Sequence, residues 1–140
     1  MRTFIFACVH NAGRSQISAA FFNLLADPTN AQAISAGTHP AEQVHPVVVE
    51  VMREVGIDLS QAKPQKLTAE LAQNAEMLIT MGCGDECPFV PGLIREDWPL
   101  PDPKGQAVEA VRETRDNIKQ RIVELIEQRQ VPSVQMPKET

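Results

Sequence analysis

An uninterrupted apolar stretch opens the chain and is followed at once by a short polar turn and a helical pattern. The stretch covers residues 3–9, the turn covers residues 10–13, and the helical pattern begins at Arg14. An apolar run of this length without alternation is typical of a strand buried on both faces, as in a parallel sheet. The apolar residues expected on one face of the helix are Ile17, Phe21, Leu24 and Leu25. A buried strand that leads through a turn into a helix predicts an α/β fold.

The rest of the chain continues the alternation of strands and helices. The further strands expected are residues 31–37, 76–81 and a short one at 93–96. The further helices expected run from Pro46 to Gly56, over 69–74 and over 106–129. In the first of these, the apolar residues Val48, Val51, Met52 and Val55 recur at helical spacing. This alternation implies parallel pairing with right-handed crossovers, and therefore a three-layer sandwich with helices on both faces of a sheet. In such sheets the ligand binds at the carboxyl ends of the strands, where residues 8–15 lie.

Length and charge limit the number of domains and the kind of partner. The chain has 140 residues, and a domain averages about 150, so one domain is expected over residues 1–130. Residues 131–140 contain two prolines and are expected to form a flexible C-terminal tail. With 13 Lys and Arg against 18 Asp and Glu, the net charge of −5 argues against a nucleic-acid partner. No apolar run approaches the ~18 residues of a membrane span, so no membrane partner is expected.

The three cysteines are Cys8, Cys83 and Cys87. An odd count without a recognisable secretory signal argues against a disulfide framework and indicates reactive thiols in a cytoplasmic protein. Cys83 and Cys87 could ligate zinc, but a Cys-x3-Cys pair supplies only two of the four ligands of a closed structural site, so no metal is expected. The two residues could also be inert loop thiols.

The segment from Cys8 to Ser15 carries the chemistry of the chain. It joins a buried strand to the amino end of a helix, where backbone amides and the helix dipole form a cradle for an oxyanion. Gly13 permits a tight turn, Arg14 can grip two oxygens of the anion, and Ser15 can donate to the Cys8 sulfur. The same positive field stabilises the thiolate of Cys8, which is the nucleophilic form. The predicted oxyanion-binding residues are Val9, His10, Asn11, Ala12, Gly13, Arg14 and Ser15.

Two of the candidate residues also have ordinary structural explanations. Cys8 could be a buried residue that ends a strand, since free cysteine is among the most buried residue types. The strand before it, the helix after it and the glycine within the loop favour a nucleophile. Asp102 lies in the proline-rich stretch 99–103 and could be a general acid that protonates a leaving oxygen. It could also be a turn-forming aspartate before proline, and the local sequence by itself favours the turn.

The segment Cys8-Val9-His10-Asn11-Ala12-Gly13-Arg14-Ser15 resembles the anion loop of the low-molecular-weight protein tyrosine phosphatases and of the arsenate reductases built on the same fold. The Asp102-Pro103 pair resembles the pair that supplies the general acid in both groups, and Asn11 matches an asparagine that fixes the loop geometry. The resemblance extends over about residues 1–130. It implies a four-stranded parallel sheet flanked by helices, with Cys8 as the nucleophile and Asp102 as the general acid.

Cys83 and Cys87 separate the two groups, because a phosphatase needs one cysteine whereas an arsenate reductase must supply two electrons. The resemblance implies that Cys83 resolves the adduct of Cys8 with arsenic, and that Cys87 then takes over the disulfide for reduction by thioredoxin. The spacing between Cys83 and Cys87 is shorter than in the best-known three-cysteine members and resembles members that use a small thiol such as mycothiol. In that subgroup these two cysteines need not be redox partners.

These observations together predict reduction of arsenate to arsenite, as part of arsenic detoxification. The catalytic residues implied are Cys8, Arg14, Cys83, Cys87 and Asp102. Phosphate and sulfate are expected to compete with arsenate, and no bound cofactor is expected. The external reductant is thioredoxin or, alternatively, a small thiol of the mycothiol or bacillithiol type. Two other functions stay open: hydrolysis of phosphomonoesters, and a non-catalytic redox or anion sensor.

Overall fold

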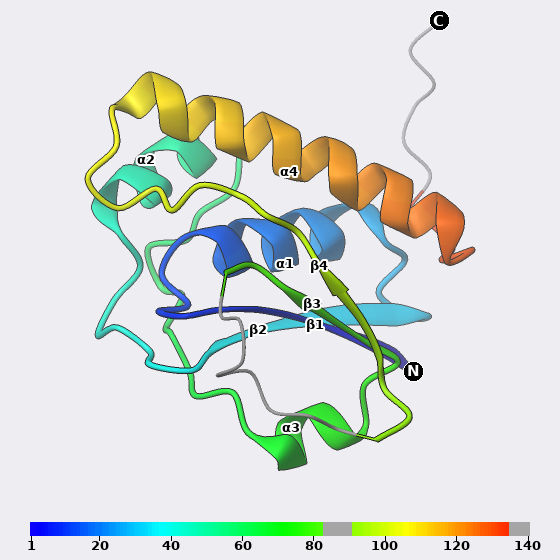
Figure 1. Ribbon diagram of the computed structural model, residues 1–140. Helices are drawn as coiled ribbons and strands as arrows, with labels where there is room; N and C mark the ends of the chain where they lie inside the picture. Colours follow the sequence, from blue (N-terminus) through cyan, green and yellow to red (C-terminus); the bar gives the residue numbers. More distant parts are fainter. Residues whose placement is uncertain (83–90, 135–140) are drawn as a thin grey trace, which may run out of the picture.

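Four parallel strands form one sheet, and helices cover both of its faces (Figure 1). The structure is a computed structural model, and it describes residues 1–82 and 91–134. The strands are β1 (Arg2–Cys8), β2 (Ala31–Gly37), β3 (Met77–Thr80) and β4 (Ile94–Asp97), in the spatial order β2-β1-β3-β4. The helices are α1 (Arg14–Leu25), α2 (Pro46–Arg53), α3 (Ala69–Gln73) and α4 (Val108–Gln128). The predicted three-layer sandwich with a four-stranded parallel sheet is confirmed.

The central strand β1 sends its side chains alternately into two cores. Phe4 and Phe6 pack with residues of α1, α2 and α4 in the larger core, whereas Ile5 and Ala7 belong to the smaller core next to α3. Figure 1 shows the same division, with α1, α2 and α4 on one face of the sheet and α3 on the other. All four side chains are fully buried. Burial on both faces explains why the sequence shows an unbroken apolar run here.

The carboxyl ends of the strands meet at one end of the sheet. Cys8 is in register with Gly37 of β2, and Ala7 is in register with Thr80 of β3. Directly after β4, the Trp98 amide donates to the Thr80 carbonyl at 2.8 Å. The segments that follow all four strands therefore start at the same end of the sheet, which is where ligands bind in open α/β folds.

Two apolar faces differ from those expected from the sequence. In α1, Leu24 is 49% exposed, whereas Phe22 is fully buried. The reason is that α1 packs against both the sheet and α4. The buried part of its surface is therefore wider than the single apolar stripe expected from the sequence, and it is centred on other residues. Val55, expected in the apolar stripe of the second helix, is also exposed. It lies beyond the end of α2 at Arg53, in a turn that closes at Gly56 with φ +81°.

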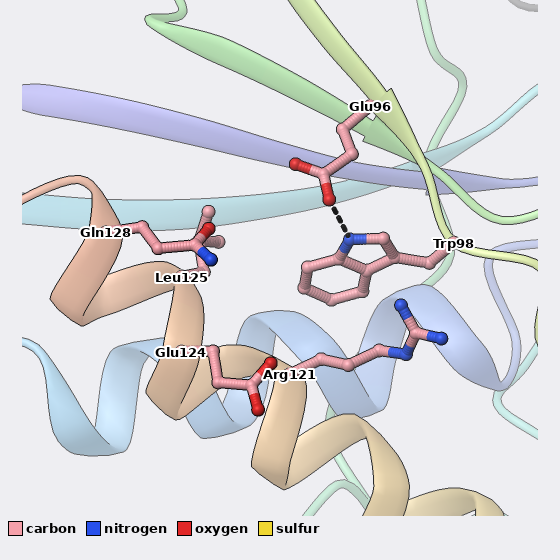
Figure 2. A pocket seen from close by; sticks show the side chains of 6 residues that line it. All are labelled: Glu96, Trp98, Arg121, Glu124, Leu125 and Gln128. Carbon is pink, nitrogen blue, oxygen red and sulfur yellow. Dashed lines mark hydrogen bonds between the residues drawn. The ribbon is translucent and has the colours of Figure 1, made fainter.

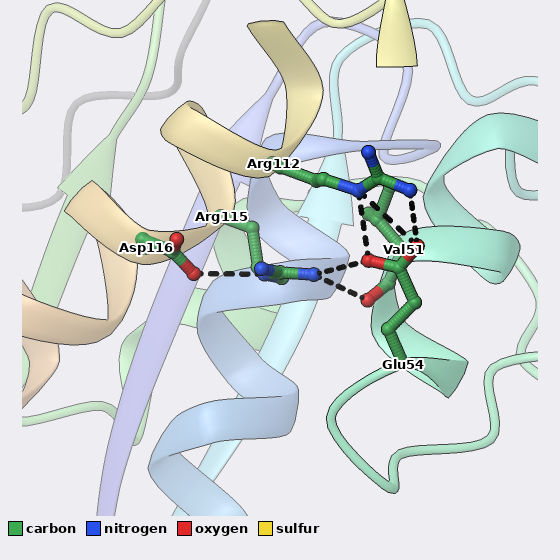
Figure 3. A network of polar contacts seen from close by, with 5 residues as sticks. All are labelled: Val51, Glu54, Arg112, Arg115 and Asp116. Atoms are coloured by element: carbon green, nitrogen blue, oxygen red, sulfur yellow. Dashed lines mark hydrogen bonds and ion pairs between the residues drawn. The ribbon is translucent and has the colours of Figure 1, made fainter. Parts of the chain in front are cut away.

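A network of ion pairs joins the end of α2 to α4 (Figure 3). Glu54 accepts hydrogen bonds from Arg112 at 2.7–3.2 Å and from Arg115 at 2.8 Å. Arg115 is buried, and it also donates to the Val51 carbonyl and to the Asp116 carboxylate, both at 2.9 Å. The bonds from Arg112 and then Arg115 lower the pKa of Glu54 to about 2. The network thus links two helices that cover the same face of the sheet.

The described part of the C-terminal segment packs against the domain. Val131 is buried, Ser133 forms a bridge with Ala26, and the Val134 amide donates to the Leu25 carbonyl at 2.9 Å. Residues 131–134 of the expected tail are therefore held against the end of α1. Residues 135–140 lie outside the described part of the chain. Of the helices that the structure describes, none has the length and apolar character needed to cross a membrane.

Candidate functional site

The segment that follows β2 holds the loop between β1 and α1 from the outside. Four backbone amides between residues 38 and 45 donate to carbonyl groups of Cys8 and of the loop. The four bonds are Thr38 N to Cys8 O (3.2 Å), His39 N to Val9 O (2.7 Å), Ala41 N to His10 O (2.9 Å) and His45 N to Ala12 O (2.9 Å). In a trans peptide unit the C=O and the following N–H point in opposite directions. This pattern therefore turns the amides of residues 9, 10, 11 and 13 toward the inside of the loop.

The amino end of α1 adds further donors to the same concavity. The first helical bond runs from the Ile17 amide to the Gly13 carbonyl at 3.0 Å, and the amides before it have no acceptor within the helix. The helix dipole places partial positive charge at this end. The predicted oxyanion-binding residues 9–15 thus comprise a loop over 9–13 and the first two residues of α1, and their amides suit a tetrahedral anion.

Cys8 ends β1 beneath this loop and is 2% exposed. The Asn11 amide donates to Cys8 Sγ at 3.3 Å, and Ser15 Oγ lies 3.0 Å from the sulfur. Asn11 Nδ2 donates to Ser15 Oγ at 2.7 Å, which leaves the hydroxyl hydrogen of Ser15 free to point at Cys8 Sγ. Two hydrogen-bond donors thus converge on the sulfur of the predicted nucleophile.

Asn11 connects the loop to its surroundings and is fully buried. Its Oδ1 accepts from the Gln65 amide at 2.9 Å and from Gln16 Nε2 at 3.3 Å, while Gln16 Nε2 also donates to the Asn11 carbonyl at 3.1 Å. Its backbone has φ +51°, in the left-handed region that asparagine enters more readily than most residues. The side chain and backbone of Asn11 together determine the curvature of the loop.

Arg14 begins α1 and is only 8% exposed. Nη1 donates to the Leu100 carbonyl at 3.0 Å, and Nη2 lies 3.9 Å from Asp102 Oδ2. Within the described residues, the buried Nε has no hydrogen-bond partner. Leaving a buried charged donor unpaired is costly, and an oxyanion in the loop would supply the missing acceptor.

Asp102 has one oxygen in a turn and the other beside Arg14. Oδ1 accepts from the Lys104 amide at 3.0 Å, which is the contact of a turn-forming aspartate. Oδ2 is the atom near Arg14 Nη2, and the side chain is 44% exposed. Partial burial lowers the pKa of the nearby His45, and the negative charge of Asp102 opposes this effect. Both explanations of Asp102 are therefore compatible with its position.

The Asp102-Pro103 segment approaches the anion loop closely at Gly13. A β-carbon added to Gly13 would lie 2.6 Å from Pro103 Cγ and 3.6 Å from His45 Cδ2. Such a distance to the rigid proline ring leaves no room for a side chain. Gly13 is thus required by the contact that keeps Asp102 near the loop, in addition to the tight turn expected from the sequence.

The two other cysteines, Cys83 and Cys87, lie outside the described residues, so their expected roles stay predictions. The preceding residues Met81 and Gly82 follow β3 at the same end of the sheet as Cys8. Over residues 1–82 and 91–134, no group of three or more His, Cys, Asp or Glu side chains is arranged to hold a metal ion.

A separate small cleft lies between β4 and α4 (Figure 2). Its lining residues are Glu96, Trp98, Arg121, Glu124, Leu125 and Gln128. The Trp98 indole donates to Glu96 at 3.1 Å, and the Arg121 guanidinium lies 5.7 Å from the Trp98 ring centre. The ring also packs on Phe6, so Trp98 is chiefly a core residue. None of the predicted site residues lines this cleft.

Several partners of the site were not identified from the sequence. They are Gln16, Gln65, Gly82, Leu100 and the amides of residues 38–45. Most of them contribute a backbone amide or carbonyl, and Gly82 contributes only the absence of a side chain. Such contributions cannot be recognised from the residue type. Gln16, two positions after Arg14, was the only one of these whose side chain could have drawn attention.

Comparison with known sequences gives a consistent picture. Residues 3–134 match the family described as Low molecular weight phosphotyrosine protein phosphatase. A "Putative arsenate reductase" of Halobacterium salinarum is 41% identical over 129 residues, which cover 89% of this chain and 91% of that protein. A "Glutaredoxin arsenate reductase" of Synechocystis sp. is 33% identical over 129 residues, which cover 90% of this chain and 97% of that protein.

Solved structures share the fold. A thioredoxin-dependent arsenate reductase of Corynebacterium glutamicum matches with a TM-score of 0.79 at 38% identity, covering 93% of this chain but 62% of that chain. A structure described as an arsenate reductase in the oxidized state matches with a TM-score of 0.80 at 33% identity, covering 91% of this chain and 98% of that one. With the anion loop and four-stranded sheet in place and the match over residues 3–134, the chain belongs to the low molecular weight phosphotyrosine protein phosphatase family.

Proposed function

We propose that this protein reduces arsenate to arsenite as part of arsenic detoxification. The observation that carries the proposal is the buried guanidinium of Arg14, whose Nε has no acceptor among the described residues, at the end of a loop that directs two donors at Cys8 Sγ. A tetrahedral oxyanion in the loop would pair with Arg14 and present its central atom to the sulfur. The similarity to arsenate reductases, and the presence of Cys83 and Cys87, favour arsenate as that oxyanion.

The first step is a substitution at arsenic without a change in oxidation state. The Cys8 thiolate attacks As(V) and forms an S–As bond, while one arsenate oxygen departs. Asp102 donates a proton to that oxygen, which leaves as water. The position of Asp102 Oδ2, 3.9 Å from Arg14 Nη2, supports this role because Arg14 would hold the neighbouring oxygens of the same anion.

The second step transfers two electrons. Cys83 attacks Cys8 Sγ, the S–As bond breaks with its electron pair on arsenic, and As(V) becomes As(III). Arsenite leaves, and the two thiols remain as a Cys8–Cys83 disulfide. Cys87 then attacks Cys83, which frees Cys8 and creates a Cys83–Cys87 disulfide. The roles of Cys83 and Cys87 rest on the family resemblance and on their place directly after β3 in the sequence.

An external thiol must return the enzyme to its reduced state. We propose a dithiol protein of the thioredoxin type, because one similar structure is described as thioredoxin-dependent and one relative as a glutaredoxin arsenate reductase. A small thiol such as mycothiol or bacillithiol is the alternative, and it would need only Cys8. Either reductant is supplied by a reducing compartment, which agrees with the cytoplasmic location expected from the sequence.

Reconstituted turnover tests the proposal directly. The purified protein is supplied with arsenate, thioredoxin, thioredoxin reductase and NADPH, and released arsenite is measured. A second reaction replaces thioredoxin with mycothiol and its recycling enzymes. Arsenite release with either reductant, abolished in Cys8→Ser, supports arsenate reduction.

After one turnover, Cys87→Ser should hold a Cys8–Cys83 disulfide that mass spectrometry detects. Full activity of both Cys83→Ser and Cys87→Ser with the small thiol would overturn the relay. No arsenite with any reductant would overturn the function.

A phosphomonoesterase is the second candidate, because the family match is to phosphatases and hydrolysis needs only the anion loop and an acid. The same Cys8 attack on phosphorus would form a phosphocysteine, which water then hydrolyses. Hydrolysis of para-nitrophenyl phosphate at a rate exceeding arsenate reduction would favour this function. Anion binding with neither reaction would favour the sensor.

A further inference from the structure

We propose that Gly82 is a positioning residue for Arg14. The missing side chain at this position leaves the space in which the guanidinium lies, and so determines how tightly the loop binds an oxyanion. This inference rests on the proposed function, in that Arg14 must bind the substrate anion, but it does not depend on which reaction follows.

The contact between Gly82 and Arg14 is unusually close. A β-carbon built on Gly82 would lie 2.9 Å from Arg14 Nη1, 3.6 Å from Cζ and 3.8 Å from Nη2. All three atoms belong to the guanidinium, which therefore faces the bare α-carbon of Gly82. Non-bonded heavy atoms prefer separations of about 3.5–4.0 Å, so a methyl group and this position of Nη1 are incompatible.

Neither side of the contact can withdraw easily. The residue before Gly82 is buried, and its amide donates to the Ala7 carbonyl at 2.7 Å, which anchors the backbone to β1. On the other side, Arg14 is buried and Nη1 donates to the Leu100 carbonyl at 3.0 Å. A methyl group at position 82 would thus be accommodated by breaking the bond to Leu100 and rotating the guanidinium. The guanidinium would then take another orientation relative to the anion loop, and its contacts with a bound oxyanion would change with it.

The chain provides a matched control for the backbone effect. Gly82 has φ +87° and Gly56 has φ +81°, so alanine is strained at both positions to a similar degree. At Gly56 an added β-carbon would meet no atom within 4 Å. The two Gly→Ala variants therefore share the strain and differ in the contact with Arg14.

Calorimetric titration with inorganic phosphate tests the inference. We expect Gly82→Ala to weaken phosphate binding about tenfold or more, the equivalent of one charge-assisted hydrogen bond, and Gly56→Ala to stay within about twofold of wild type. Both variants should lose thermal stability through backbone strain, and Gly82→Ala should lose more because the bond from Arg14 to Leu100 is also broken. Wild-type affinity for phosphate in Gly82→Ala, or equal losses of phosphate affinity in both variants, would overturn the inference.

A double-variant cycle shows whether Gly82 acts through Arg14. In an Arg14→Ala background, Gly82→Ala should cause no further loss of phosphate binding, since the space is then vacant. If Gly82→Ala alone does not fold, adding Arg14→Ala should restore the fold, and failure to do so would overturn the inference. A wild-type protein that binds phosphate but releases no arsenite would refute arsenate reduction while leaving this test intact.

Discussion

The two sides of the anion loop are built differently. On the Cys8 side the side chains hold one another: Asn11 bonds to Ser15 and accepts from Gln16, Ser15 lies against the Cys8 sulfur, and the Gln65 amide closes the group from outside. On the Arg14 side the contacts are few, with one bond to a backbone carbonyl and a buried Nε without an acceptor among the described residues.

The two sides of the loop therefore have different tasks: the Cys8 side aims the nucleophile, and the Arg14 side binds the anion. The side-chain hydrogen bonds around Cys8 are formed without a ligand, which suits a nucleophile that must be aimed before the substrate arrives. On the Arg14 side, Nε has no acceptor among the described residues, and we expect a bound anion to supply it. Substitutions on the first side should therefore lower stability together with activity, whereas those on the second should lower binding or turnover and leave the fold intact.

The largest effect is expected for Arg14→Lys. An ammonium group cannot make the bidentate contact of a guanidinium. The loss of two charge-assisted hydrogen bonds should lower kcat/KM for arsenate by about 10²–10⁴-fold. Thermal unfolding should stay close to wild type. Near-normal turnover in this variant would remove Arg14 from the proposed mechanism. Loss of the fold would contradict the expectation that substitutions on the Arg14 side leave the fold intact.

The next largest effect is expected for Asp102→Asn. The amide oxygen can still accept from Lys104, so the turn should persist, but the proton donor is lost. We expect kcat to fall about 10²-fold, at the lower end of general-acid contributions. Phosphate affinity should hold or improve, because a negative charge near Arg14 is removed. Steady-state kinetics with phosphate as a competitor separates the two quantities; an unchanged kcat would reduce Asp102 to a turn residue.

Asn11→Ala should affect both stability and activity. It removes a buried acceptor and donor and leaves Gln65 N and Ser15 Oγ short of partners. We expect a loss of about 1–3 kcal/mol in the free energy of unfolding. Activity should fall about tenfold as the Ser15 hydroxyl loses its orientation toward Cys8.

The control for Asn11 is Asn23→Ala. The Asn23 side chain also makes two bonds, to the amide and carbonyl of Ala33 at 2.8 and 3.0 Å, but these lie at the outer side of β2. This variant should lose stability without losing turnover. Urea unfolding and arsenite release measured on both variants check the comparison, and equal activity losses would contradict it.

The smallest effect is expected far from the loop, for Glu54→Gln. The bonds from Arg112 and Arg115 lower the pKa of Glu54 to about 2, below its ordinary value of 4.5. A group with a lowered folded-state pKa contributes stability that is present above the unfolded pKa and is lost as the pH falls through the folded one. The Glu54 contribution should therefore disappear between about pH 4.5 and 2 in wild type and be absent in the variant. Urea unfolding over this range measures it, with arsenate turnover at neutral pH unchanged.

Much of the fold followed from local pattern. The unbroken apolar run became β1, the turn and helix after it became the anion loop and α1, and the alternation of elements gave the parallel sheet. The errors were at Leu24, which lies in α1 as expected but is exposed, and at Val55, which lies beyond the end of α2. Spacing defines which residues share a helix face, and only the neighbouring elements decide how much of that face is covered.

The residues of the candidate site divide in the same way. Cys8, Arg14 and the loop between them could be predicted because a strand, a glycine turn and a helix end form this cradle from eight consecutive residues. Asp102 needed the family resemblance, since its local sequence by itself favours a turn-forming residue. Leu100, Gln65 and Gly82 could not be predicted, because they act through a carbonyl, an amide and an empty space.

By itself, therefore, the sequence determined the kind of site: a thiol, a loop of amides and a guanidinium at the end of a buried strand. The tertiary structure decided how that site is held. Residues 38–45 turn the loop amides inward, the Leu100 carbonyl and the bare α-carbon of Gly82 place Arg14, and the contact of Pro103 with Gly13 places Asp102. The physical reason is that local sequence sets backbone geometry and chemical type, whereas the direction of a long side chain depends on atoms brought next to it by distant segments.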